Sequence, residues 1–253
     1  MTALVNRERV LLAGGQRALV MQLAHPLVAA GVAEHSEFPA RALARLRRTL
    51  DLSLALIYGS PEEVRAASDA IRAVHDRVSG EVEGRSYSAH DPALLMWVNA
   101  TLIDTTLVVY ERFVRPLDEG ERSRYYLETV EAAAQFGIPA GFIPPDLEAF
   151  RSYMDGMLDG DELGATEDSR RLVRNVLRPP LPLPLRSPTA ILRQITVVLL
   201  PERIRQMFDL RPGLVARTTL RAGSAASRVL LPWLPSLVRD FSRARAAAPA
   251  RRE

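Results

Sequence analysis

The feature that most constrains this chain is a long apolar stretch, from Pro92 to Phe113, that contains only a few polar side chains. Asp91 and Pro92 supply a favoured N-cap and a favoured first residue, so the stretch predicts one long helix. A helix that is apolar on nearly every side is buried, and the rest of the chain is expected to wrap around it. Its polar groups then need partners, and we expect Asp104 to pair with a buried arginine rather than to act as a base.

Helical periodicity also dominates the flanking sequence. Apolar residues recur every three or four positions over 39–58, and the capping box Ser60-Pro61-Glu62-Glu63 opens another helix that ends at Gly80. Further helical patterns cover residues 8–24, 118–136, 146–158, 167–177, 189–199, 201–208 and 213–230. No segment has a convincing strand pattern. The sequence thus predicts an all-α fold, a single multi-helix domain with a central buried helix.

The division of the chain follows from a proline-rich segment at 178–188, which predicts an extended connector. Residues 1–177 are expected to form the helical core, 189–242 to form C-terminal helices that pack on it, and 243–253 to form a disordered basic tail. Residues 228–241, RVLLPWLPSLVRDF, are apolar and contain two prolines. Packing onto the core is the favoured prediction for this segment, and peripheral contact with a membrane surface is the alternative.

The residue types that are missing exclude several kinds of chemistry. The 253 residues include no cysteine, which excludes disulfides, thiolate nucleophiles and iron–sulfur clusters, and no lysine, which excludes Schiff bases. The net charge of +3 and the scattered arginines argue against nucleic-acid binding. The charged N-terminal segment is a poor signal peptide, and no run of about 18 uncharged apolar residues predicts a membrane span. We therefore expect a cytoplasmic protein, with membrane association as the alternative.

Histidines are the remaining candidates for chemistry, and the chain has four: His25, His35, His75 and His90. None has the HExxH spacing of zinc proteases or the Glu-x-x-His spacing of di-iron bundles. Two HD dipeptides, at His75 and His90, leave a metal-dependent phosphohydrolase as a weak alternative. His25 precedes a proline and is expected to bond the backbone freed at that kink, while His90 is expected to anchor a loop and His35 to be exposed.

His75 and two arginines are the strongest of these leads. His75 lies at the edge of an apolar stripe, where a histidine is more often a core group than a ligand. Proximal haem ligation requires the same arrangement, a single imidazole facing an apolar pocket. Arg45, Arg48 and Thr49 lie together on one side of the helix over 39–58, where they form either a solvated face or a pocket wall.

Five ordered segments resemble a known family. They are AHPLVAAGVAEHSEF, RLRRTLDLSLALIYGSPEE, IRAVHDRVSG, YSAHDPALLMWVNATL and YERFVRPL. Together, over about residues 8–160, they resemble the oxygenase family of the latex-clearing rubber oxygenases and MpaB, also called the DUF2236 family. The resemblance implies a globin-like haem b domain in residues 1–177 that uses O2 to cleave carbon–carbon double bonds of an apolar, isoprenoid substrate. The alternative is a non-catalytic helical protein that binds haem or lipid.

The resemblance also implies roles for individual residues. His75 matches the histidine that ligates the haem iron on the proximal side. Arg45, Arg48 and Thr49 match a distal Arg-x-x-Lys-Thr segment, and Arg48 replaces its lysine. Because arginine is bulkier and always charged, this replacement puts rubber as the substrate in doubt. Arg45 and Arg48 are the candidate catalytic residues, since a guanidinium would stabilise negative charge developing on oxygen.

Two further residues are candidates for contact with the cofactor, His25 and Asn99. The full set of candidate cofactor-binding residues is His25, Arg45, Arg48, Thr49, His75 and Asn99. Glu34 or Glu37 lies near the position of a distal carboxylate.

Overall fold

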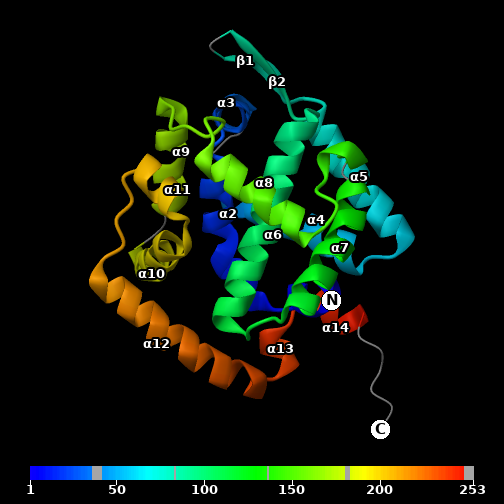
Figure 1. Cartoon of the computed structure of the whole chain (residues 1–253). Helices are drawn as coiled ribbons and strands as arrows, with labels where there is room; N and C mark the ends of the chain where they lie inside the picture. Colours follow the sequence, from blue (N-terminus) through cyan, green and yellow to red (C-terminus); the bar gives the residue numbers. More distant parts are fainter. Residues whose placement is uncertain (36–41, 83, 136, 180–182, 248–253) are drawn as a thin grey trace.

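The central element of the fold is α6 (Pro92–Phe113), around which the other helices are arranged in the computed structural model (Figure 1). The structure describes residues 1–35, 42–82, 84–135, 137–179 and 183–247. The Asp91 carboxylate accepts the Ala93 N–H at 2.8 Å, and Trp97 and Ala100 are wholly buried. The predicted N-cap and the predicted burial of this helix are both confirmed.

Helices make up most of the described chain. Before α6 they are α1 (Thr2–Asn6), η1 (Arg9–Gly14), α2 (Gly15–Gln22), α3 (Pro26–His35), α4 (Ala42–Tyr58) and α5 (Pro61–His75). After it they are α7 (Glu119–Gln135), η2 (Ala140–Phe142), α8 (Leu147–Asp159), α9 (Glu167–Leu177), α10 (Leu183–Leu199), α11 (Glu202–Met207), α12 (Leu214–Leu230), η3 (Leu231–Trp233), α13 (Ser236–Arg239) and α14 (Ser242–Ala247). The predicted all-α class is confirmed.

One short antiparallel hairpin was not predicted. β1 (Ser79–Val82) pairs with β2 (Arg85–Ser88), and Gly84 supplies the positive φ of 75° in the turn between them. The Tyr87 ring is buried with residues of α3 and α6. The expectation of no strand was wrong because four-residue strands are too short to show a period of two.

The close approach of η1 and α2 to the central helix depends on glycine. A Cβ atom on Gly14 would lie 2.6 Å from Thr105 Cγ2 and 2.9 Å from Val109 Cγ2. The predicted helix over 8–24 is accordingly divided at Gly14 into a 3-10 turn and α2. This packing brings Arg17 into the core against α6.

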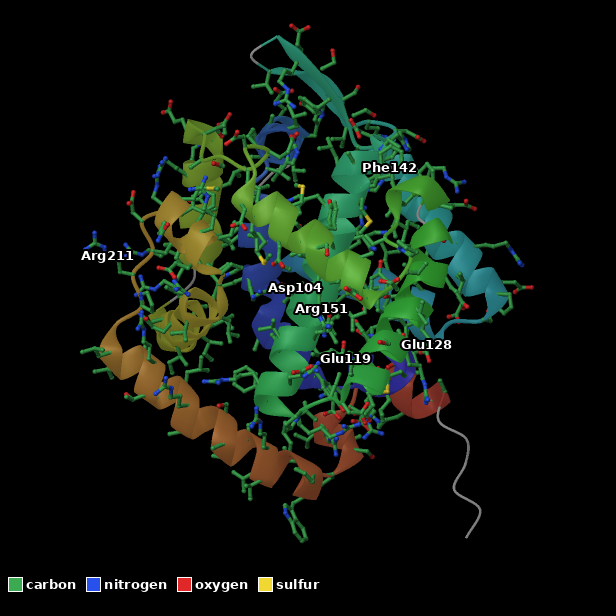
Figure 2. All side chains as sticks on the ribbon, viewed as in Figure 1. Asp104, Glu119, Glu128, Phe142, Arg151 and Arg211 are labelled. Carbon is green, nitrogen blue, oxygen red and sulfur yellow. The ribbon has the colours of Figure 1, made fainter. Side chains whose placement is uncertain are left out.

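Arg17 is the partner that the polar side chains of α6 were predicted to need. Its Nη1 lies 2.7 Å from a carboxylate oxygen of Asp104 and donates to Thr105 Oγ1 at 2.7 Å. Its Nε–H donates to the Leu199 carbonyl at 2.9 Å, which ties α10 to the same point. The prediction that Asp104, labelled in Figure 2, pairs with a buried arginine is confirmed.

The C-terminal part differs from its prediction in three places. The connector expected to be extended is helical from Leu183 onward, and residues 180–182 lie outside the described part. The tail expected to be disordered is helical to Ala247, and Ala244 of α14 packs with the preceding Phe241 against Leu54 of α4. The favoured prediction that 228–241 packs on the core was wrong, because Trp233 is 82% exposed and most of its neighbours are exposed too. Pro232 and Pro235 cannot donate helical hydrogen bonds, and the chain turns along the surface there.

α6 also meets the length and apolarity of a membrane-crossing helix, contrary to the expectation that no segment would do so. Half of the apolar stretch of α6 is buried inside the fold, as is usual for the core helix of a globular domain.

Candidate functional site

Four of the site residues suggested by the sequence, Arg45, Arg48, Thr49 and His75, lie on the helical hairpin of α4 and α5. These helices pack against each other and are joined by Gly59 and Ser60. The predicted capping box is present: the Glu63 N–H donates to Ser60 Oγ at 3.3 Å, and the Ser60 N–H donates to the Glu63 carboxylate at 2.9 Å. Arg45, Arg48 and Thr49 lie in the first half of α4, and His75 is at the end of α5.

An open groove of about 530 Å³ follows this hairpin. Its apolar floor is contributed by both helices, and charged groups stand at its edges. The lining residues are Arg48, Asp51, Leu52, Ala55, Glu63, Ala66, Ala67 and Arg243. Arg243 donates to the Glu63 carboxylate at 2.9 Å, so α14 closes one end of the groove.

The predicted distal residues differ in how they relate to the groove. Arg48 lines it, and both Arg48 and Thr49 are exposed, but Thr49 is not a lining residue. The side chain of Arg45 lies outside the described part of the chain. The structure thus places one predicted arginine in a cavity large enough for a ligand.

His75 is the last residue of α5 and is half-buried. It lies roughly 12 Å further along the helix axis than Ala67 and does not line the groove. Burial, and then the nearby His90, lower the pKa of His75 below its ordinary value of 6.5. The ring is therefore neutral near pH 7, which is the form that ligates a metal.

His90 and Asp76 form the immediate surroundings of His75. The rings of His75 and His90 meet edge to face with centroids 6.0 Å apart, and His90 Nε2 lies 2.7 Å from Asp76 Oδ1. This pair anchors the loop before α6, as predicted for His90. Its proximity to His75 was not predicted, although the two HD dipeptides were a signal for it. Among the described residues, no group of three or more His, Asp or Glu side chains is placed to hold a metal ion.

His25 has a separate environment. It is buried in the turn between α2 and α3, and its Nδ1 accepts the Leu27 N–H at 3.3 Å. This is the predicted role at the proline kink. Burial lowers its pKa, and the charges that act on it belong to Glu162, Arg85 and Asp91 rather than to α4 or α5.

Glu34 accepts a hydrogen bond from the β1–β2 hairpin. The Tyr87 hydroxyl donates to the Glu34 carboxylate, and burial together with this bond raises the pKa of Tyr87 to about 12. His35 is exposed, as predicted, and its Nε2 lies 3.1 Å from the Ser79 carbonyl. Glu37 lies outside the described residues.

Asn99 carries an unsatisfied donor inside the fold. Its Nδ2 is buried and has no hydrogen-bond partner among the described residues. A buried donor without a partner costs about 1–3 kcal/mol, and such a group in a native protein calls for a polar ligand, water or ion. The neutral imidazole of His75 is able to ligate a metal through a ring nitrogen, and the free amide of Asn99, on a different helix, is able to donate a hydrogen bond.

The fold and the groove define an α-helical domain with a ligand-sized site on a helical hairpin. A family model described as "ER-bound oxygenase mpaB/B'/Rubber oxygenase, catalytic domain" matches residues 3–231, and the chain belongs to this family. This membership confirms the resemblance and supports an oxygenase-type enzyme.

Two curated relatives are similar to the chain. They are "Uncharacterized protein Rv2237" of Mycobacterium tuberculosis and "Uncharacterized protein Mb2261" of Mycobacterium bovis, each 28% identical over 171 residues. The match covers 65% of this chain and 67% of each relative. No solved structure matches.

Proposed function

We propose that this protein is a haem b-dependent oxygenase that acts with O2 on an apolar, isoprenoid substrate and cleaves a carbon–carbon double bond. The observation that carries the proposal is the position of His75. A neutral, half-buried imidazole lies at the end of α5, and a groove beside the first turns of the same helix contains Arg48. Family membership supplies the oxygenase class.

In this proposal four kinds of residue have separate roles. His75 would hold the haem iron through a ring nitrogen, and Asn99 would donate to a polar atom of the cofactor. Bound haem supplies the redox chemistry of O2. Arg48 keeps a fixed positive charge in the groove, where it would pair with a carboxylate or stabilise negative charge developing on oxygen. Leu52 and Ala55 give the groove an apolar floor for an apolar substrate.

The absorption spectrum of the purified protein reconstituted with haemin tests the proposal. We expect a Soret band and oxygen consumption in the presence of an isoprenoid alkene. The His75→Ala variant should lose or shift the band, whereas His35→Ala, a matched substitution of an exposed histidine, should leave it unchanged. A wild-type protein without a Soret band, or an unchanged spectrum in His75→Ala, would contradict the proposal.

The apolar floor of the groove supports a second candidate, a non-catalytic protein that binds haem or a lipid. A haem-binding protein of this kind would keep the Soret band without consuming oxygen. A lipid-binding protein would show no band and would bind apolar fluorescent probes.

A further inference from the structure

Exposed apolar side chains are concentrated on α12, η3 and α13. Of the fifteen large apolar side chains exposed in the described residues, eight lie between 214 and 238. Trp233 is 82% exposed, Leu214 80%, Val215 77% and Leu237 67%. We call this region the 214–238 surface. Single exposed apolar residues are normal on a protein, but a group as dense as the six between residues 229 and 238 marks a candidate binding surface.

Only a short part of α12 packs against the body of the protein. Its buried residues are Leu220 and Ser224, and its Ser227 Oγ donates to the Phe113 carbonyl at 2.8 Å. α12 lies along the edge of the molecule, and the chain turns back toward the body of the protein at α13 (Figure 1). Many of its side chains point away from the body of the protein (Figure 2). The outer side of this segment therefore has no partner within the described chain.

The charge of the segment is entirely of one sign. Residues 210–239 contain no aspartate or glutamate and five arginines: Arg211, Arg217, Arg221, Arg228 and Arg239. Arg239 is used inside the fold, where it pairs with Glu8, and Arg228 donates to the Glu111 carbonyl at 2.6 Å. Arg211, Arg217 and Arg221 are exposed, and no ion pair with a described carboxylate involves them.

The spacing along α12 separates the two kinds of side chain. Arg217, Arg221 and Arg228 follow one another by four and seven residues and form a row along one side. Val215, Ala222 and Val229 are spaced by seven and form an apolar row about 120° around the helix from the arginines. A helix with an apolar side, a basic flank and a nearby exposed tryptophan has the composition of a helix that lies in a membrane interface.

We propose that the 214–238 surface binds an anionic lipid bilayer. Trp233, Leu237 and the apolar row of α12 enter the headgroup layer, and Arg217 and Arg221 lie over the lipid phosphates. A second copy of the chain is a poorer partner, because a symmetric contact would bring the same arginines together. The inference is independent of the proposed oxygenase activity.

Vesicle flotation of the full chain tests the proposal. We expect binding to phosphatidylcholine vesicles that contain phosphatidylglycerol, little binding to phosphatidylcholine alone, and weaker binding as salt rises. The double variants Trp233→Ser with Leu237→Ser, and Arg217→Gln with Arg221→Gln, should each bind about tenfold more weakly or worse. The matched controls are Leu127→Ser, at an apolar residue 50% exposed on α7, and Arg174→Gln with Arg203→Gln, at exposed arginines elsewhere. Both controls should bind like the wild type.

Tryptophan fluorescence gives a second measurement, since the chain has two tryptophans and Trp97 is wholly buried. Anionic vesicles should shift the emission of the wild type to the blue, and Trp233→Phe should abolish the shift while the protein still floats. The proposal is overturned if the wild type does not float, if neutral vesicles bind it equally, or if the apolar double variant still floats. A dimeric wild type that does not bind vesicles, and that becomes monomeric in the Trp233→Ser, Leu237→Ser double variant, would also overturn the proposal.

Discussion

Arg239 donates its Nε–H to the carboxylate oxygens of Glu8, at distances of 2.9 and 2.8 Å, and Glu8 is wholly buried. The contact joins the start of the chain to the end of α13. It is reinforced by the Phe241 N–H, which donates to the Arg7 carbonyl at 2.9 Å. The 214–238 surface is therefore held at its C-terminal end by a buried ion pair, although its outer side has no partner among the described residues.

Removal of this arginine should destabilise the fold. Arg239→Gln leaves the buried Glu8 carboxylate with only the 3.4 Å contact to Arg7 Nε, which should lower the free energy of unfolding by about 3 kcal/mol. Urea denaturation measures the loss. Arg243→Gln removes the exposed partner of Glu63 and should change stability by less than about 1 kcal/mol. An equal decrease in the free energy of unfolding in the two variants would show that the buried ion pair contributes no more than the exposed one.

Two adjacent glycines should respond in opposite ways to alanine. Gly14→Ala would force a Cβ against Thr105 and Val109 of α6, and we expect a loss of about 1–3 kcal/mol. No atom lies within 4 Å of a Cβ built on Gly15, whose φ of −56° suits alanine. Gly15→Ala should therefore stabilise the protein by about 0.4–1 kcal/mol. Thermal unfolding of the two variants compares them directly, and a gain in Gly14→Ala would contradict the close packing.

Stability should fall as the pH drops below 6.5, the ordinary pKa of histidine. Burial lowers the pKa of His25, and Arg85 acts in the same direction, against Glu162 and Asp91. The unfolded chain then binds a proton that the folded chain does not, so the free energy of unfolding declines, by up to about 1.4 kcal/mol per pH unit for each such histidine.

His25→Asn tests this assignment, because the asparagine oxygen can still accept the Leu27 N–H but does not titrate. The decline below pH 6.5 should become shallower and should not vanish, since the pKa of His75 is lowered as well. Urea denaturation over a series of pH values measures the slope. A slope as steep as that of the wild type would show that His25 does not contribute.

Replacement of Asn99 by an apolar residue should raise the stability of the cofactor-free protein and weaken its binding of haemin. Because its Nδ2 has no partner among the described residues, Asn99→Leu should stabilise the cofactor-free protein by about 1 kcal/mol and weaken the retention of haemin. Thr101→Val is the matched control on the same helix, since Thr101 Oγ1 donates to the Val98 carbonyl at 2.7 Å and accepts from Gln22 at 3.2 Å. The control should lose stability without a change in haemin binding. Unchanged haemin binding in Asn99→Leu would remove Asn99 from the site.

Features that depend on neighbours in the sequence were predictable. The caps at Asp91 and Ser60 and the burial of the helix from Pro92 to Phe113 follow from local hydrogen bonding and from apolar periodicity. The family also followed from the order of its segments, and with it the oxygenase class. The haem, the substrate and the role of His75 stay predictions.

Only the tertiary structure decided which groups meet. Arg17 and Asp104 are 87 positions apart, and Glu8 and Arg239 are 231 apart, so no local pattern could join them. Arg48 lines a groove because α5 and α14 pack beside α4, whereas His25 lies in a different environment although its sequence made it a candidate. Sequence by itself determined that the segment from 228 to 241 is apolar. Its exposure was decided by packing, since whether an apolar segment is buried depends on which surfaces the rest of the fold leaves free to cover it.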